Sequence, residues 1–369
     1  MKSLIIGVNL NNNIFFNENL KEFFMLAESA GAVVSEYIVV KRDKPDKKYF
    51  IGKGKVEEIS TILLTNNSIE VVLFDQPLSP SQQRNLESIW KVRVVDRISL
   101  ILDIFALRAK SHEGKLQVEL AQLEYLSTRL TRMWTHLERQ RGGIGMRGPG
   151  ESQLEMDRRI INDKVKILKD RIKKLRLRRD SQRSLREKNR AFSVSLVGYT
   201  NSGKSTLFNI LAKENTYVAD QLFATLDTTS RNIWINNSIN KNIVLSDTVG
   251  FIRDLPHSLI DSFHATLYEA SSADLLLHVV DVFNENYHEQ IANVNSVIKE
   301  IGASNIPTIM VYNKIDLSNL QPRVEYDSDG LISSVFLSAA KNAGIDYLRN
   351  AIAKISNTVR QNVENFKNI

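Results

Sequence analysis

The chain contains no cysteine among its 369 residues. Disulfide bonds, thiolate metal sites and cysteine nucleophiles are therefore excluded, which agrees with a reducing compartment. No apolar stretch approaches the roughly 18 residues that would suggest a membrane-spanning helix. Position 2 is not glycine and the C-terminus carries no cysteine, so we expect no lipid anchor. These absences favour a cytoplasmic protein that is not held at a membrane.

Acidic residues are scarce in the segment 171–190. It holds ten Lys or Arg residues against two acidic ones, a local charge of +8. Because the whole chain carries +7, the remainder is close to neutral, at −1. A solvated helix face is one interpretation, but such faces usually alternate Glu with Lys four residues apart. A concentrated basic stripe on an otherwise neutral chain favours the phosphate backbone of a nucleic acid as partner.

The first hundred residues alternate strand-like with helix-like segments. The expected strands are 4–8, 32–40, 70–74 and 92–95, and the expected helices are 20–30, 55–64 and 81–90. This alternation predicts a parallel sheet covered by helices. The segment Gly52-Lys53-Gly54 leads into one of these helices and is compatible with either an anion-binding loop or a tight turn with a cap.

Beyond Lys115 the pattern changes to two long helices. Apolar residues recur at spacings of three, four or seven, which predicts an antiparallel coiled-coil hairpin. The second helix, if continuous from residue 151 to 190, would be about 60 Å long. The expected seam residues are Leu116, Leu120, Leu123, Leu130, Trp134 and Leu137 in the first helix, and Leu154, Ile161, Val165, Leu168, Ile172 and Leu175 in the second.

The loop that joins these helices, residues 142–150, holds five of the chain's 16 glycines. A plain helix connection needs few residues and one glycine, so five indicate a backbone that approaches another surface closely. Basic residues are expected around this tip, namely Arg129, Arg132, Arg139, Arg141 and Arg147. The sequence therefore predicts an arm with a basic, glycine-rich tip.

Five segments in the second half of the chain each follow an apolar, strand-like run. The first, residues 198–205, reads Gly-Tyr-Thr-Asn-Ser-Gly-Lys-Ser and has the spacing of a loop whose backbone N–H groups cradle phosphate. The others are 223–227, 247–250, 313–316 and 338–340. Open α/β sheets bind ligands at the carboxyl ends of their strands, where these segments are expected to meet. Together they predict a domain that binds and hydrolyses GTP.

Three residues are expected at the reacting phosphate, namely Lys204, Thr225 and Gly250. Ser205 and Thr225 are expected to bind Mg²⁺ directly, and Asp247 to bind it through water. Gly250 can place its N–H group against the γ-phosphate and switch when that phosphate leaves.

The segment 313–316 is expected to recognise the base. Asp316 can accept hydrogen bonds from both N1–H and N2–H₂ of guanine, whereas adenine offers no such pair. Asn313 and Lys314 are expected to brace the base and the phosphate loop, and the N–H group of Ala339 to donate to guanine O6. The complete set of expected GTP-binding residues is Gly198, Tyr199, Thr200, Asn201, Ser202, Gly203, Lys204, Ser205, Phe223, Ala224, Thr225, Leu226, Asp227, Asp247, Thr248, Val249, Gly250, Asn313, Lys314, Ile315, Asp316, Ser338, Ala339 and Ala340.

Phe251 follows Gly250, where many signalling GTPases carry a glutamine that orients water. Because phenylalanine cannot hydrogen-bond water, we expect slow intrinsic hydrolysis unless a partner or an ion completes the site. Asn201 is a candidate ligand for K⁺ bridging the phosphates. Its other interpretation is a loop-shaping residue that hydrogen-bonds the backbone.

These segments resemble the HflX family of bacterial GTPases, in the Obg-related group. The likeness covers roughly residues 1–355 and is carried by residues 50–58, 74–75, 78–87, 114–123, 142–150, 153–155, 223–227 and 247–251. The resemblance implies that the hairpin tip enters the large (50S) ribosomal subunit near the peptidyl-transferase centre and contacts its rRNA. It also implies dissociation or rescue of stalled ribosomes, with the GTP state controlling engagement. Larger family members carry a C-terminal extension that we expect to be absent here.

The expected fold class is α/β with three parts. These are an N-terminal α/β domain (1–105), a helical hairpin (106–190) and a GTPase domain with a mainly parallel sheet (191–358), followed by a polar tail (359–369). We expect the closing helix of the GTPase domain over 345–355 and a monomer when the protein is free. The alternatives are a ribosome-assembly factor or regulatory switch without splitting activity, a switch that dimerises through the hairpin, and an ATP-driven RNA-remodelling enzyme, which Asp316 disfavours.

Overall fold

This computed structural model describes residues 1–133, 149–188, 191–213, 222–223, 225–235, 238, 242–253 and 269–367. The predictions for Ala224, for Trp134 and Leu137 in the seam, and for most of the tip with its Arg139, Arg141 and Arg147, lie outside the described residues. The chain divides into two compact units, Met1–Lys174 and Leu175–Ile369, whose boundary falls within one long helix. The α/β fold class predicted from the sequence is confirmed in both units.

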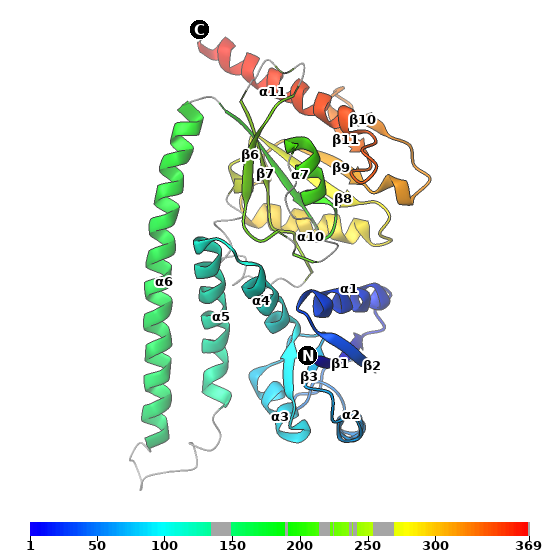
Figure 1. The fold of residues 1–369 in the computed structure, drawn as a ribbon, viewed down its shortest axis with the longest axis vertical. Helices are drawn as coiled ribbons and strands as arrows, with labels where there is room; N and C mark the ends of the chain where they lie inside the picture. Colours follow the sequence, from blue (N-terminus) through cyan, green and yellow to red (C-terminus); the bar gives the residue numbers. More distant parts are fainter. Residues whose placement is uncertain are drawn as a thin grey trace. The chain divides into compact units, whose positions relative to one another are not determined.

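A four-stranded parallel sheet organises the first unit, with strand order β2-β1-β3-β4. The strands are β1 (Lys2–Leu10), β2 (Val33–Arg42), β3 (Val71–Phe74) and β4 (Arg93–Asp96), and the helices are α1 (Phe16–Ser29), α2 (Lys53–Thr65), α3 (Pro80–Trp90) and α4 (Arg97–Arg108). Figure 1 shows α2 and α3 on one face of this sheet and α1 and α4 on the other. All seven elements predicted in this region are present, and α4 is an element that the sequence analysis missed.

Local signals explain where these helices begin. The hydroxyl of Ser79 accepts from the N–H group of Gln82, and the Gln82 side chain accepts from the N–H group of Ser79, a reciprocal cap ahead of Pro80. Gly52 is the N-cap of α2, and its carbonyl oxygen accepts from the N–H group of Lys55 at 3.0 Å. This geometry agrees with the turn-and-cap interpretation of the loop. Its anion-binding interpretation stays a prediction.

Asp96 joins the first unit's sheet to the hairpin. This fully buried carboxylate ends β4 and caps α4, where it accepts from the N–H group of Ser99 at 3.0 Å. From α5 it accepts the Tyr125 hydroxyl at 2.6 Å and the Arg129 guanidinium at 2.9 Å. The sequence analysis placed Arg129 beside the hairpin tip, and this is wrong. Arg129 is buried because its charge is neutralised by Asp96 at the edge of the sheet.

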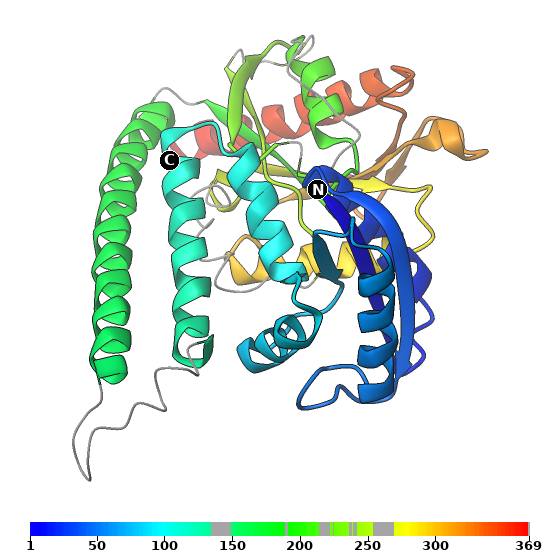
Figure 2. The same ribbon diagram turned by 60° about the horizontal axis from the view of Figure 1, so that its bottom comes forward.

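The predicted hairpin helices are α5 (His112–Met133) and α6 (Pro149–Lys188). At 1.5 Å per residue, the 40 residues of α6 span about 60 Å. Within the first unit, α5 runs beside the N-terminal part of α6 in both ribbon views (Figures 1 and 2). Of the predicted seam residues, Leu116, Leu120 and Leu168 are buried, and α5 also packs against α3 and α4. The ion pair between Lys169 and Glu124, at 2.8 Å, also links the two helices.

The second unit contains a seven-stranded sheet with the order β10-β11-β9-β8-β5-β7-β6. Its strands are β5 (Phe192–Gly198), β6 (Thr229–Ile233), β7 (Ile243–Asp247), β8 (Leu275–Asp281), β9 (Thr308–Asn313), β10 (Arg323–Tyr326) and β11 (Ile332–Phe336). The five central strands are parallel, and β6 and β10 run antiparallel at the two edges. The prediction of a mainly parallel sheet is therefore confirmed.

Helices cover both faces of this sheet. α7 (Lys204–Ala212) and α11 (Ile345–Lys367) bury Leu207, Phe208 and Leu348 in one core with the central strands, whereas α10 (Tyr287–Glu300) packs on β5 and β8 from the other side. The closing helix α11 continues to Lys367, so the predicted end near residue 355 is wrong. No helix in the described part of the chain is long and apolar enough to cross a membrane.

Candidate functional site

The loop between β5 and α7 is shaped by two glycines. Gly198 and Gly203 have φ angles of +150° and +94°, which side chains rarely adopt. A Cβ atom on Gly198 would lie 2.2 Å from the carbonyl oxygen of Val279, and one on Gly203 would lie 2.2 Å from Nδ2 of Asn313. Both glycines are therefore required for the loop to close against β8 and β9.

Lys204 begins α7 and is 6% exposed. Its ammonium group donates to the carbonyl oxygens of Gly198 at 3.0 Å and Tyr199 at 2.7 Å. Burial lowers the pKa of Lys204 to about 8, while the charge of Asp247 opposes this shift. A phosphate beside this amine would favour its charged form, so the position suits an anion-binding lysine.

Ser205, Thr225 and Asp247 converge on one point although they come from three separate segments. The Ser205 hydroxyl lies 2.7 Å from both the Thr225 hydroxyl and Oδ2 of Asp247. Among the described residues, the buried Oδ1 of Asp247 has no hydrogen-bond partner, and burial raises the pKa of this carboxyl. Two hydroxyls and a carboxylate are the hard oxygen donors that Mg²⁺ prefers. The residues present therefore fit the magnesium site expected from the sequence.

Gly250 brings the segment after β7 against the phosphate loop. A Cβ atom on Gly250 would meet Cα of Thr200 at 2.9 Å and Nζ of Lys204 at 3.1 Å, so this approach requires glycine. Phe251, the next residue, is only 2% exposed, and its ring belongs to the buried side chains. Its burial agrees with the prediction that residue 251 does not orient water.

At the opposite end of the pocket, Asn313 connects two loops. Its amide nitrogen donates to the carbonyl oxygen of Ser202 at 2.9 Å, and its amide oxygen accepts from the N–H group of Ala339 at 2.9 Å. Because this N–H group already has a partner, the predicted bond to guanine O6 would require Ala339 to exchange Asn313 for the base. Asp316 accepts from the Ser338 hydroxyl at 2.6 Å, which fixes its carboxylate on the same side.

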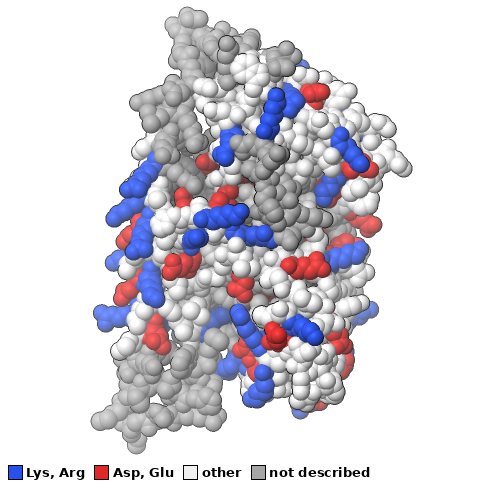
Figure 3. All heavy atoms as spheres, in the orientation of Figure 1, with Lys and Arg blue, Asp and Glu red and all other residues white. Residues whose placement is uncertain are grey.

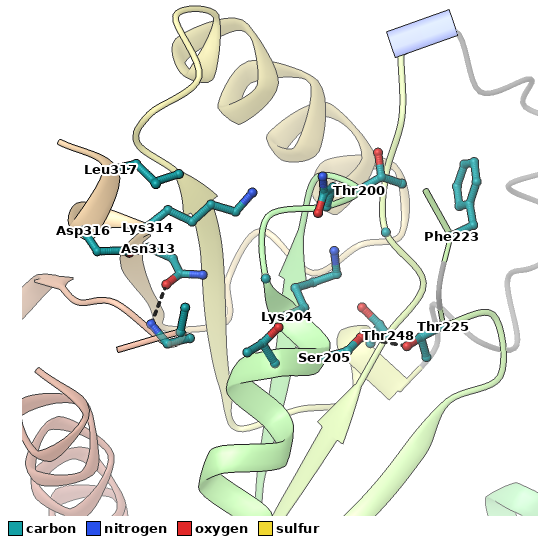
Figure 4. Close-up of a pocket in the computed structure, with 16 residues that line it drawn as sticks. Thr200, Lys204, Ser205, Phe223, Thr225, Thr248, Asn313, Lys314, Asp316 and Leu317 are labelled. Carbon is teal, nitrogen blue, oxygen red and sulfur yellow. Dashed lines mark hydrogen bonds between the residues drawn. The ribbon is translucent and has the colours of Figure 1, made fainter. Parts of the chain in front are cut away.

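These groups surround a cavity of about 370 Å³. In Figure 4, Lys204, Ser205, Thr225 and Thr248 lie at one end, and Asn313, Lys314, Asp316 and Leu317 lie at the other. The predicted residues that line it are Thr200, Asn201, Gly203, Lys204, Ser205, Phe223, Thr225, Thr248, Gly250, Asn313, Lys314, Asp316, Ala339 and Ala340. The size suits a nucleotide-sized ligand.

Other predicted site residues support the cavity without lining it. Val249, Leu226 and Ile315 are buried in the core, and Ser202 and Ser338 act through the hydrogen bonds of the loops. Lys314, which does line the cavity, has a φ of +64° and pairs with Asp281 at 2.7 Å. The sequence analysis missed Thr206 and Leu317, which complete the lining. Their positions beside Ser205 and Asp316 were the available signal.

Comparison with known proteins covers most of the chain. Three family models match in succession: GTP-binding GTPase N-terminal over residues 17–106, GTP-binding GTPase Middle Region over 108–186, and 50S ribosome-binding GTPase over 193–314. GTPase HflX of Escherichia coli K12 is 50% identical over 346 residues, which cover 93% of this chain and 80% of that protein. The chain belongs to the HflX family of GTPases.

Further relatives support membership of the HflX family. GTPase HflX of Flavobacterium psychrophilum is 44% identical and covers 99% of this chain and 88% of its own length. Among solved structures, a crystal structure of SsGBP and GDP complex is similar with a TM-score of 0.52 and 28% identity, over 97% of this chain and 99% of that one. The resemblance stated from the sequence motifs is thereby confirmed, and the likeness extends across both units of this HflX-family chain.

Proposed function

We propose that this protein binds GTP in the cavity described above and hydrolyses it with Mg²⁺. The observation that carries the proposal is the arrangement of the two ends. Ser205, Thr225 and Asp247 form an oxygen-rich cluster beside Lys204, whereas Asp316 lies across the cavity. Asn313 links the loops that bear these groups through two hydrogen bonds. A guanine base at Asp316 would leave its phosphates directed toward the magnesium cluster.

In this proposal Lys204 and Ser205 hold the phosphates and the metal ion, which neutralises charge on the transferred group when bound. Gly250 presents its N–H group to the γ-phosphate, and Thr225 links the segment 223–227 to the metal site. Asn201, with a φ of +58° in the phosphate loop, is the proposed ligand for K⁺. Since Phe251 cannot orient water, we propose that a partner, together with this ion, completes the hydrolytic site.

We propose that this partner is the large ribosomal subunit. Support comes from the match to the 50S ribosome-binding GTPase model and from the exposed basic residues of α6. In Figure 3, Lys and Arg side chains gather along the edge where Figure 1 places α6. The exposed basic residues described on that helix are Arg158, Arg159, Lys164, Lys166, Lys169, Arg171, Lys173, Lys174 and Arg178. Such a stripe suits the phosphate backbone of rRNA.

The activity proposed is dissociation or rescue of ribosomes by a cytoplasmic monomer, with the GTP state controlling engagement. The cytoplasmic location is proposed because the proposed partner is the ribosome. A ribosome-assembly or regulatory function without splitting is the second candidate, and the family match is equally compatible with it.

Two variants test this function. Neutralising Arg171, Lys173, Lys174 and Arg178 with Gln should weaken sedimentation with large subunits and flatten its dependence on salt, because phosphate contacts are lost. Replacing residues 142–150 with a short polar linker should leave intrinsic GTP hydrolysis intact but abolish the splitting of 70S particles, measured at fixed salt. Equal splitting by the tip-replaced protein and the parent would refute the role of the arm. Binding and stimulation without any splitting by the parent would favour the second candidate.

A further inference from the structure

Phe251 pairs with the backbone of the phosphate loop. The N–H group of Phe251 donates to the carbonyl oxygen of Gly198 at 3.1 Å, and the N–H group of Thr200 donates to the carbonyl oxygen of Phe251 at 2.7 Å. Tyr199 and Phe251 thus form a parallel β-bridge. The segment that follows Gly250 is therefore attached to the loop that surrounds the phosphates.

The side chain of Tyr199 adds a third attachment. Its hydroxyl oxygen accepts from the backbone N–H group of Arg253 at 2.8 Å. Tyr199 is 6% exposed and does not line the cavity, so its ring lies behind the phosphate loop and does not face the nucleotide. The phenol therefore acts on the site through the segment that it holds.

That segment directly follows Gly250, the residue proposed to contact the γ-phosphate. Gly250 approaches Thr200 and Lys204 so closely that a Cβ atom would lie 2.9 Å from the first and 3.1 Å from the second. A shift of residues 251–253 would draw Gly250 away from Lys204, because the connecting backbone is short. GDP lacks the phosphate that Gly250 would contact, so the consequence should fall on GTP.

We propose that Tyr199 is a positioning residue, whose hydroxyl holds Gly250 in place for the γ-phosphate through the N–H group of Arg253. This inference rests on the proposed GTP site and deepens it by naming a determinant of the preference for the triphosphate. The hydroxyl supports the GTP-bound arrangement and leaves the guanine end of the cavity untouched, since Asp316 and Asn313 hold separate bonds.

The test is Tyr199→Phe, which removes the hydroxyl oxygen and keeps the buried ring. Tyr326→Phe, at an exposed tyrosine on β10, is the matched control. Dissociation constants are measured for GDP and for a non-hydrolysable GTP analogue, together with kcat and KM for GTP. Loss of one uncharged hydrogen bond should weaken analogue binding about three- to tenfold and lower kcat by a similar factor. GDP affinity, the thermal midpoint and all values for the control should stay at the parental level.

Two results would overturn the inference. Equal losses for GDP and the analogue would assign Tyr199 a general role in folding the loop, and parental values for both would show that the hydroxyl positions nothing. A parent protein that binds neither nucleotide would refute the proposed GTP site instead, so the two failures are distinguishable. If Tyr199→Phe lowers the thermal midpoint, the ratio of analogue to GDP affinity still decides, because a loss of folded protein affects both ligands equally.

Discussion

Replacing Asp316 with asparagine should transfer the base preference of the site from guanine to xanthine. The Asp316 carboxylate is held by the Ser338 hydroxyl at 2.6 Å, and an amide oxygen can accept the same bond, so the loop should keep its form. The amide nitrogen, however, presents a donor where guanine also presents donors. A hydrogen bond to a charged group is worth about 1.5 to 3 kcal/mol. Loss of two such bonds should weaken GTP binding by roughly 150-fold to 25,000-fold.

The assay is a direct titration of the variant with GDP, GTP and xanthosine triphosphate. Xanthine carries a carbonyl at C2 that can accept from the new amide, so its triphosphate should bind Asp316→Asn more tightly than GTP does. Asp329→Asn, in the exposed turn between β10 and β11, controls for the loss of one negative charge. GTP affinity unchanged in Asp316→Asn would refute the assignment of the base to this end of the cavity.

Three further predictions concern the hairpin attachment, the phosphate loop and the sheet. Arg129→Met should destabilise the first unit by about 3 to 5 kcal/mol in urea unfolding, because Asp96 would remain buried without its ion-pair partner; a loss below about 1 kcal/mol would contradict the buried ion pair. Potassium should accelerate GTP hydrolysis relative to sodium, and Asn201→Ala should abolish that difference. Equal rates of the parent protein in both salts would refute the proposed K⁺ site. Burial, assisted by the charge of Lys204, lowers the pKa of His278 to about 4, below its unfolded value of 6.5. As the pH falls, the unfolded chain therefore takes up a proton on His278 before the folded chain does. The free energy of unfolding should drop by about 3 kcal/mol between pH 6.5 and 4, and His278→Gln should abolish this part of the pH dependence.

The phosphate end of the site was predictable because its residues follow strands in order. Lys204, Ser205 and Asp247 stand at the carboxyl ends of β5 and β7, which are neighbours in the sheet, so strand prediction alone brings them together. Thr225 reaches the same cluster from the segment before β6, the antiparallel neighbour of β7. The partner of the Ala339 N–H group was not predictable, because it depends on which of two acceptors, Asn313 or a base, the loop geometry favours.

The errors in the hairpin and at the helix ends have physical causes. Helical periodicity shows that Arg129 lies on a given face of α5, but it does not show whether that face meets solvent or an acid from another element. Helix α4 was missed because Asp96 both ends β4 and caps the helix, so no loop residues separate the two elements. The polar composition after residue 355 suggested a tail, yet α11 continues because polar residues are also compatible with a helix.

The central claim is that GTP hydrolysis in the second unit depends on the large ribosomal subunit. The most direct measurement is the rate of GTP hydrolysis at fixed salt and Mg²⁺, with and without purified large subunits, and with purified small subunits as the control. Because Phe251 cannot orient water, the free protein should hydrolyse GTP slowly, and large subunits alone should raise its kcat by at least about tenfold. An unchanged rate with large subunits, or equal stimulation by small subunits, would contradict the account.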